Sequence, residues 1–80
     1  MKATSVNINK SIQALSIHLV RRISEEQNCS EEDALKKLLK TMTYELLQDR
    51  ETELYAESSE YLWNMFRDEE NGNLEPWLKE

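Results

Sequence analysis

Apolar residues recur with a helical period in the first part of the chain. They fall three or four positions apart and outline one face of a helix, made up of Ile8, Ile12, Leu15, Leu19 and Ile23. Two further apolar residues, Ile17 and Val20, lie beside or beyond this stripe. The pattern predicts an amphipathic helix over 10–27 with more apolar surface than one core-facing side needs.

A second helical pattern follows the break at Asn28-Cys29-Ser30. Ser30 is a favourable N-cap residue, and three acidic residues come directly after it, where the helix dipole favours carboxylates. Apolar residues then share one broad face: Ala34, Leu35, Leu38, Leu39, Met42 and Leu46. We therefore expect a single helix over 31–49.

A third and shorter helix is expected over 59–70. Ser58 or Ser59 would cap its start, and Asn71-Gly72-Asn73 would end it, because glycine adopts the left-handed conformation that commonly follows a helix. We interpret the charged stretch 50–57 as a loop whose Leu54 and Tyr55 attach it to the core.

The two ends of the chain differ from the helical part. Residues 1–9 are polar with alternating Val6 and Ile8, which indicates a flexible arm or a short strand, and residues 71–80 form an apolar tail within an acidic frame. The predicted fold class is all-α, with one three-helix domain over 10–70. A chain this small buries little more than about 60% of its unfolded surface. We therefore expect a homodimer or a complex with another protein.

The composition excludes several classes of site. With one Cys and one His, the chain cannot form an internal disulfide or a Cys/His metal site, and its single Gly excludes a glycine-rich phosphate loop. We expect no metal and no cofactor. No apolar run is long enough to cross a membrane, and the start of the chain lacks the apolar segment of a signal peptide. We therefore expect a cytoplasmic protein.

Few residues have the chemistry or the setting for catalysis. His18 lies on the polar face of the first predicted helix, and Cys29 lies in the turn that follows it. The acidic clusters lie at solvated helix ends, whereas a general acid needs a carboxyl group in an apolar pocket. We expect no enzymatic activity.

Charge is distributed unevenly along the chain. Residues 1–40 carry a net charge of +2, whereas residues 41–80 carry −8. An acidic surface attracts basic protein surfaces, and aromatic side chains within a charged rim are typical of interface hot spots. The predicted partner-binding residues are Tyr61, Trp63, Asp68, Glu69, Glu70, Trp77 and Leu78. Two alternatives stay open, namely that the tryptophans belong to the core and that the acids only confer solubility.

A basic strip supports a different function. Lys36, Lys37 and Lys40 follow one side of the second predicted helix, and Arg21 and Arg22 extend the strip. With a strand formed by the N-terminal arm, the outline is similar to that of a dimeric ribbon-helix-helix transcriptional regulator. The isoelectric point of about 4.8 argues against DNA binding. A structural adaptor subunit is a third alternative.

Three segments carry a family resemblance: 19–34 (LVRRISEEQNCSEEDA), 43–47 (TYELL) and 54–62 (LYAESSEYL). Over roughly residues 12–70 the chain resembles a family of small, uncharacterised bacterial helical proteins. Members of that family look like the antitoxin half of two-gene modules and are often encoded beside an ADP-ribosyltransferase-like protein. The resemblance implies a non-catalytic binder that masks a partner toxin. The acidic C-terminal half of the chain would then meet a basic cleft on that toxin. The chain departs from the family where Glu31 and Met42-Thr43 fill regions in which glycine is common.

Overall fold

The computed structural model describes residues 5–78, with side chains from Ile8 onward, and its regular elements in that range are all helical. The all-α prediction is confirmed. The elements are α1 (Ser5–Gln27), α2 (Glu31–Leu39), α3 (Met42–Gln48), the 3₁₀ turns η1 (Arg50–Thr52) and η2 (Leu54–Ala56), α4 (Ser59–Glu70) and α5 (Glu75–Leu78). The region expected to hold three helices therefore holds four α-helices and two 3₁₀ turns, and a short helix follows it.

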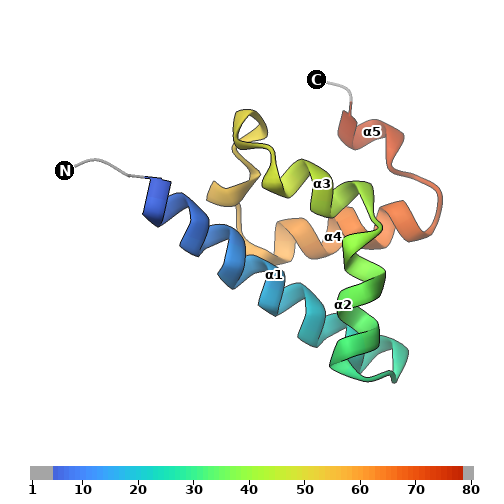
Figure 1. The fold of residues 1–80 in the computed structure, drawn as a ribbon. Helices are drawn as coiled ribbons and strands as arrows, with labels where there is room; N and C mark the ends of the chain where they lie inside the picture. Colours follow the sequence, from blue (N-terminus) through green and yellow to red (C-terminus); the bar gives the residue numbers. More distant parts are fainter. Residues whose placement is uncertain (1–4, 79–80) are drawn as a thin grey trace.

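The helices pack around one core. In Figure 1, α1 runs along one side of the molecule, and α2 turns back from the C-terminal end of α1. Helix α4 packs against both α1 and α3. α5 lies on the side of the molecule away from α1. The core is made by buried side chains from α1, α2, α3, η2 and α4: Leu15, Leu19, Ile23, Ala34, Leu38, Leu47, Leu54, Leu62, Trp63, Met65 and Phe66.

The first helix is longer than the sequence pattern suggested. α1 begins at Ser5, so the prediction of an arm or strand over 1–9 is wrong for residues 5–9, while residues 1–4 lie outside the described part. The helical spacing of Ile8, Ile12 and Leu15 continues into this segment. This helical spacing describes the segment better than the two-residue alternation of Val6 and Ile8 does. Ile8 accordingly lies partly buried in the helix.

The turn between α1 and α2 forms as the sequence predicts. Asn28 adopts a left-handed conformation with φ of 56°, and the amide of Cys29 donates to the carbonyl of Ser24 (3.1 Å). Ser30 Oγ then accepts a hydrogen bond from the amide of Asp33 (3.0 Å). The predicted N-cap of the second helix is confirmed.

The single helix expected over 31–49 is wrong, because the chain breaks between α2 and α3. Thr41 is the N-cap of α3, and its hydroxyl donates to the carbonyl of Leu38 (2.7 Å) and accepts from the amide of Tyr44 (3.1 Å). The break changes the helical register. Thr43 and Leu47 are consequently the buried residues of α3, in place of the Met42 and Leu46 of the predicted face.

The segment between α3 and α4 is ordered into two 3₁₀ turns rather than an irregular loop. Glu53 separates the turns in a left-handed conformation with φ of 59°. Leu54 follows it and is buried, as predicted, and Tyr55 is partly buried. Two charged turns thus pack against the end of α3 and are attached to the core chiefly through one leucine.

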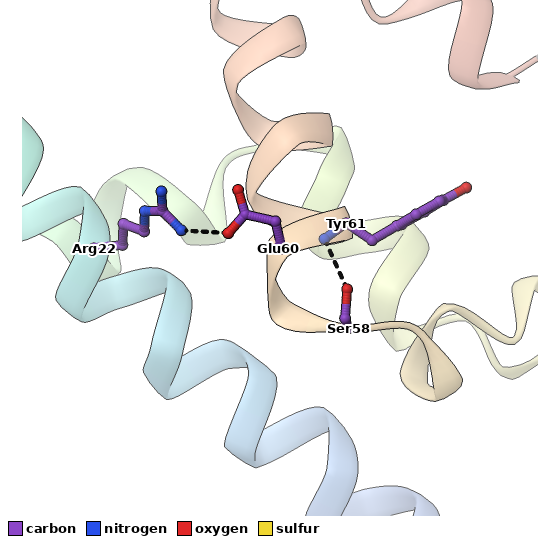
Figure 2. Close-up of polar contacts among 4 residues, drawn as sticks. All are labelled: Arg22, Ser58, Glu60 and Tyr61. Atoms are coloured by element: carbon purple, nitrogen blue, oxygen red, sulfur yellow. Dashed lines mark hydrogen bonds and ion pairs between the residues drawn. The ribbon is translucent and has the colours of Figure 1, made fainter.

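Helix α4 begins and ends where the sequence predicts. Ser58 Oγ accepts from the amide of Tyr61 (3.1 Å), as Figure 2 shows. At the other end Gly72 has φ of 79°, its amide donates to the carbonyl of Glu69 (3.0 Å), and the amide of Asn73 donates to the carbonyl of Asp68 (2.7 Å). This pair of bonds is a Schellman motif, and it turns the chain back toward the bundle.

The C-terminal segment is folded onto the bundle. Its described residues include the short helix α5, and Leu74 and Trp77 pack against the core. The apolar residues of the predicted tail therefore contribute to the fold. Within residues 5–78, no helix has both the length and the apolar character that a membrane crossing requires.

Candidate partner-binding cleft

A cleft of about 300 Å³ lies between α3, the two 3₁₀ turns, α4 and α5. Six of its eight described lining residues are apolar or aromatic, and Glu51 is the one charged residue among these eight. The other lining residues are Leu46, Thr52, Leu54, Tyr61, Met65, Trp77 and Leu78. Because pockets for small molecules span about 300–1,000 Å³, this cleft has the size for a side chain of a partner rather than for a large cofactor.

The aromatic wall of the cleft is held in a fixed geometry. The indole Nε1 of Trp77 donates a hydrogen bond to Oδ2 of Asp68 (2.7 Å). The rings of Trp77 and Tyr61 meet edge to face, with centroids 5.1 Å apart and planes at 88°. A charge-assisted bond and an aromatic contact therefore position the same indole, so little side-chain ordering is needed when a partner binds.

Apolar surface at this cleft is open to solvent. Tyr61 is 38% exposed and Leu78 is 52% exposed, whereas Trp77 is partly buried. Tyr61 and Leu78 share the cleft with the carboxylate of Glu51. Together, these groups can contact both the apolar stem and the cationic head of a lysine or arginine side chain.

The structure brings together three of the seven predicted partner-binding residues. Tyr61, Trp77 and Leu78 line the cleft, and Asp68 accepts the hydrogen bond from the indole of Trp77. Trp63 lies elsewhere, in the core, with 4% of its surface exposed. It stacks on Phe66 with ring centroids 5.5 Å apart, which is the core position that the sequence had left open as an alternative.

Glu69 has a structural contact in place of an open carboxylate. Its Oε2 accepts from the amide of Met42 (2.8 Å), and its Oε1 accepts from the amide (2.9 Å) and the hydroxyl (2.7 Å) of Thr43. A carboxylate from α4 thus caps the start of α3 from 26 residues away along the chain. Glu70, by contrast, is exposed and accepts from the side-chain amide of Gln27 (3.1 Å).

Arg22 joins α1 to α4. Its guanidinium donates to Oε1 of Glu60 (2.9 Å), as Figure 2 shows, and lies 4.8 Å from the centroid of the Trp63 ring. The pair is partly exposed, so the ion pair itself adds little stability. The guanidinium nevertheless covers the outer surface of the buried indole.

The five residues of the predicted basic strip do not form one surface. Lys36, Lys37 and Lys40 line a shallow depression together with Asp33 and Glu70. Arg22 is bound to Glu60, and Arg21 lines a different groove, between α1 and α2. The strand that the ribbon-helix-helix outline needs is helical over residues 5–9.

The described part of the chain holds no candidate metal centre, and His18 lies near Ser59. Among residues 8–78, no three His, Cys, Asp or Glu side chains are grouped so that they could hold a metal ion. His18 is exposed and shares a pocket of only about 50 Å³ with Ser59, and no hydrogen bond joins the two side chains. Sequence spacing gave no sign of this proximity, because α1 and α4 meet only in the folded chain.

The sequence did not reveal the contribution of Glu51, Thr52 and Leu54 to the cleft. They lie on turns whose path depends on contacts with α3 and α1, and short 3₁₀ segments leave no periodic pattern.

No family model, curated protein or solved structure matches the chain. Its function is therefore inferred from the geometry of the cleft.

Proposed function

We propose that this chain is a non-catalytic protein-binding module whose cleft receives a basic side chain of a partner. One observation carries the proposal: Tyr61, Trp77 and Leu78 meet in one cleft with Glu51, the charged residue among the lining residues that the structure describes. A lysine or arginine would place its apolar stem against the rings and its charge near the carboxylate.

The charge of the part of the chain that forms the cleft supports a basic partner. Residues 41–78 contain ten acidic and two basic side chains. Such an excess speeds the encounter with a basic surface and makes association sensitive to salt. The small volume of the cleft favours one anchoring side chain at the centre of a wider contact.

The antitoxin family that the sequence resembles supplies the class of partner. In this proposal the chain neutralises a toxin, such as an ADP-ribosyltransferase-like protein, by covering a basic cleft on it. Carboxylates of the acidic half would then occupy the space that the phosphates of a dinucleotide require. Inhibition by such masking needs neither a metal nor a nucleophile on this chain.

Co-expression with the product of the neighbouring gene tests the proposal. Tyr61→Ala combined with Leu78→Ser should abolish protection against that product and raise the Kd measured by calorimetry. Met42→Ser is the matched control, because Met42 is 41% exposed, close to the 38% of Tyr61, but lies outside the cleft. Both variants are first shown to be folded by circular dichroism.

Salt provides a second measurement. The Kd for the partner should rise steeply with ionic strength, and Glu51→Gln should reduce that dependence. Full protection by the Tyr61→Ala, Leu78→Ser variant would refute the cleft as the binding site. Salt-dependent binding to DNA with no binding to the neighbouring gene product would favour the transcriptional regulator instead.

A further inference from the structure

A second apolar surface lies between α1 and α2, apart from the cleft. Ile17, Val20 and Leu35 line a groove of about 400 Å³ there. Ile17 is 52% exposed and Leu35 is 42% exposed. Leu39, one helical turn after Leu35, is 51% exposed and continues the apolar surface along α2.

This surface is distinct from the core face of the same helices. α1 buries Leu15 and Leu19, and Ile17 projects from the other side of the helix because it lies two residues from each. Large aliphatic side chains on this face keep about half of their surface in contact with water when the chain folds alone. Contiguous exposed apolar surface of this kind marks a site of association.

The two edges of the groove carry opposite charges. Arg21, on α1, forms the positive edge, and Glu31 and Glu32, on α2, form the negative edge. Within residues 8–78, the structure gives none of these three side chains an ion-pair partner. All three are exposed, so they are free to meet charges on another molecule.

A groove with this layout is complementary to itself. A two-fold axis along the groove places α1 of one copy against α2 of the other, so that residue i contacts j and j contacts i. Each positive edge then faces a negative edge, and the two apolar floors pack together. We propose that the α1–α2 groove, lined by Ile17, Val20 and Leu35, is the contact surface of a homodimer of this chain.

Sedimentation of the full chain across the micromolar range tests the dimer. The wild-type protein should dimerise, and Ile17→Ser combined with Leu35→Ser should raise the dimer dissociation constant about tenfold or more. Leu78→Ser is the matched control, because it removes an equally exposed aliphatic group elsewhere and should leave dimerisation unchanged. A wild-type chain that stays monomeric throughout this range would overturn the proposal.

Charge reversal distinguishes a second copy from any other occupant. Arg21→Glu alone and Glu32→Arg alone each place like charges opposite one another, so each variant should dimerise about tenfold more weakly. Mixing the two single variants restores both attractive pairs in a heterodimer, which native mass spectrometry should detect as the dominant dimer. Variants that dimerise like the wild type, or a mixture that forms only a statistical proportion of heterodimer, would refute the arrangement.

Discussion

Glu69, on α4, and Thr43, on α3, are joined by two hydrogen bonds although they lie 26 residues apart in the chain. One carboxylate oxygen of Glu69 accepts from both the amide (2.9 Å) and the hydroxyl (2.7 Å) of Thr43. Thr43 is fully buried and is the only buried polar residue among the side chains described. In the last turn of α4, the negative charge of Glu69 opposes the dipole of that helix. The same carboxylate lies at the N-terminal end of α3, where the dipole of α3 favours a negative charge.

Loss of the Glu69 carboxylate should destabilise the whole bundle. Glu69→Ala leaves the amides of Met42 and Thr43 and the Thr43 hydroxyl without their acceptor, so the free energy of unfolding should fall by about 2–3 kcal/mol. Urea denaturation measures this change. Glu70→Ala removes a neighbouring carboxylate that accepts only one exposed bond, and it should cost less than about 0.5 kcal/mol. Equal effects of the two substitutions would contradict the capping role.

The two tryptophans should respond differently to truncation. Trp63→Ala opens a cavity in the core and should cost about 3–5 kcal/mol. Trp77→Ala detaches α5, which the bundle holds mainly through this side chain, and should cost less than about 1.5 kcal/mol. Hydrogen exchange would show protection lost throughout the bundle in the first variant and near α5 in the second. For this reason, loss of partner binding is better tested at Tyr61 and Leu78 than at Trp63.

Arg22 should matter more for its contact with Trp63 than for its ion pair. Glu60→Gln removes the ion pair and should change the free energy of unfolding by less than about 0.5 kcal/mol. Arg22→Ala also uncovers the indole and should cost about 1 kcal/mol. A double-mutant cycle over the two positions separates these effects. A Glu60 variant as unstable as the Arg22 variant would argue against the stacking contribution.

Replacement of Glu53 by glycine should stabilise the protein. A non-glycine residue in the left-handed conformation costs about 1–2 kcal/mol, of which the flexibility of glycine in the unfolded chain offsets about half. Glu53→Gly should therefore raise the melting temperature. Asn28→Gly should change it little, because asparagine tolerates a positive φ. Calorimetry gives the melting temperatures of the two variants. A lower melting temperature for Glu53→Gly would show that the native Glu53 side chain stabilises the fold by more than the backbone strain costs.

Local signals in the sequence predicted the helix ends well. Ser30 and Ser58 accept hydrogen bonds from the third residue after them, and Gly72 ends α4, because each of these contacts involves neighbours in the chain. The buried stripe of α1 was equally clear from spacing alone.

Features that depend on distant residues were not predictable from local patterns. The break before α3 is stabilised by Glu69, and no rule of spacing connects that residue with Met42 and Thr43. The cleft depends on two 3₁₀ turns and on an indole held by Asp68. The aromatic residues of the acidic half were recognised, but Trp63 and Trp77 face different parts of the molecule, which composition cannot distinguish.

The capping of α3 by Glu69 has a consequence for synthesis on the ribosome. A nascent chain that ends before residue 69 contains the whole of α3 but lacks the carboxylate that caps it. The cleft is completed later still, because α5 supplies part of its wall. The chain therefore reaches its binding-competent form only after translation has passed α5, and products truncated before α5 would lack part of the proposed binding surface.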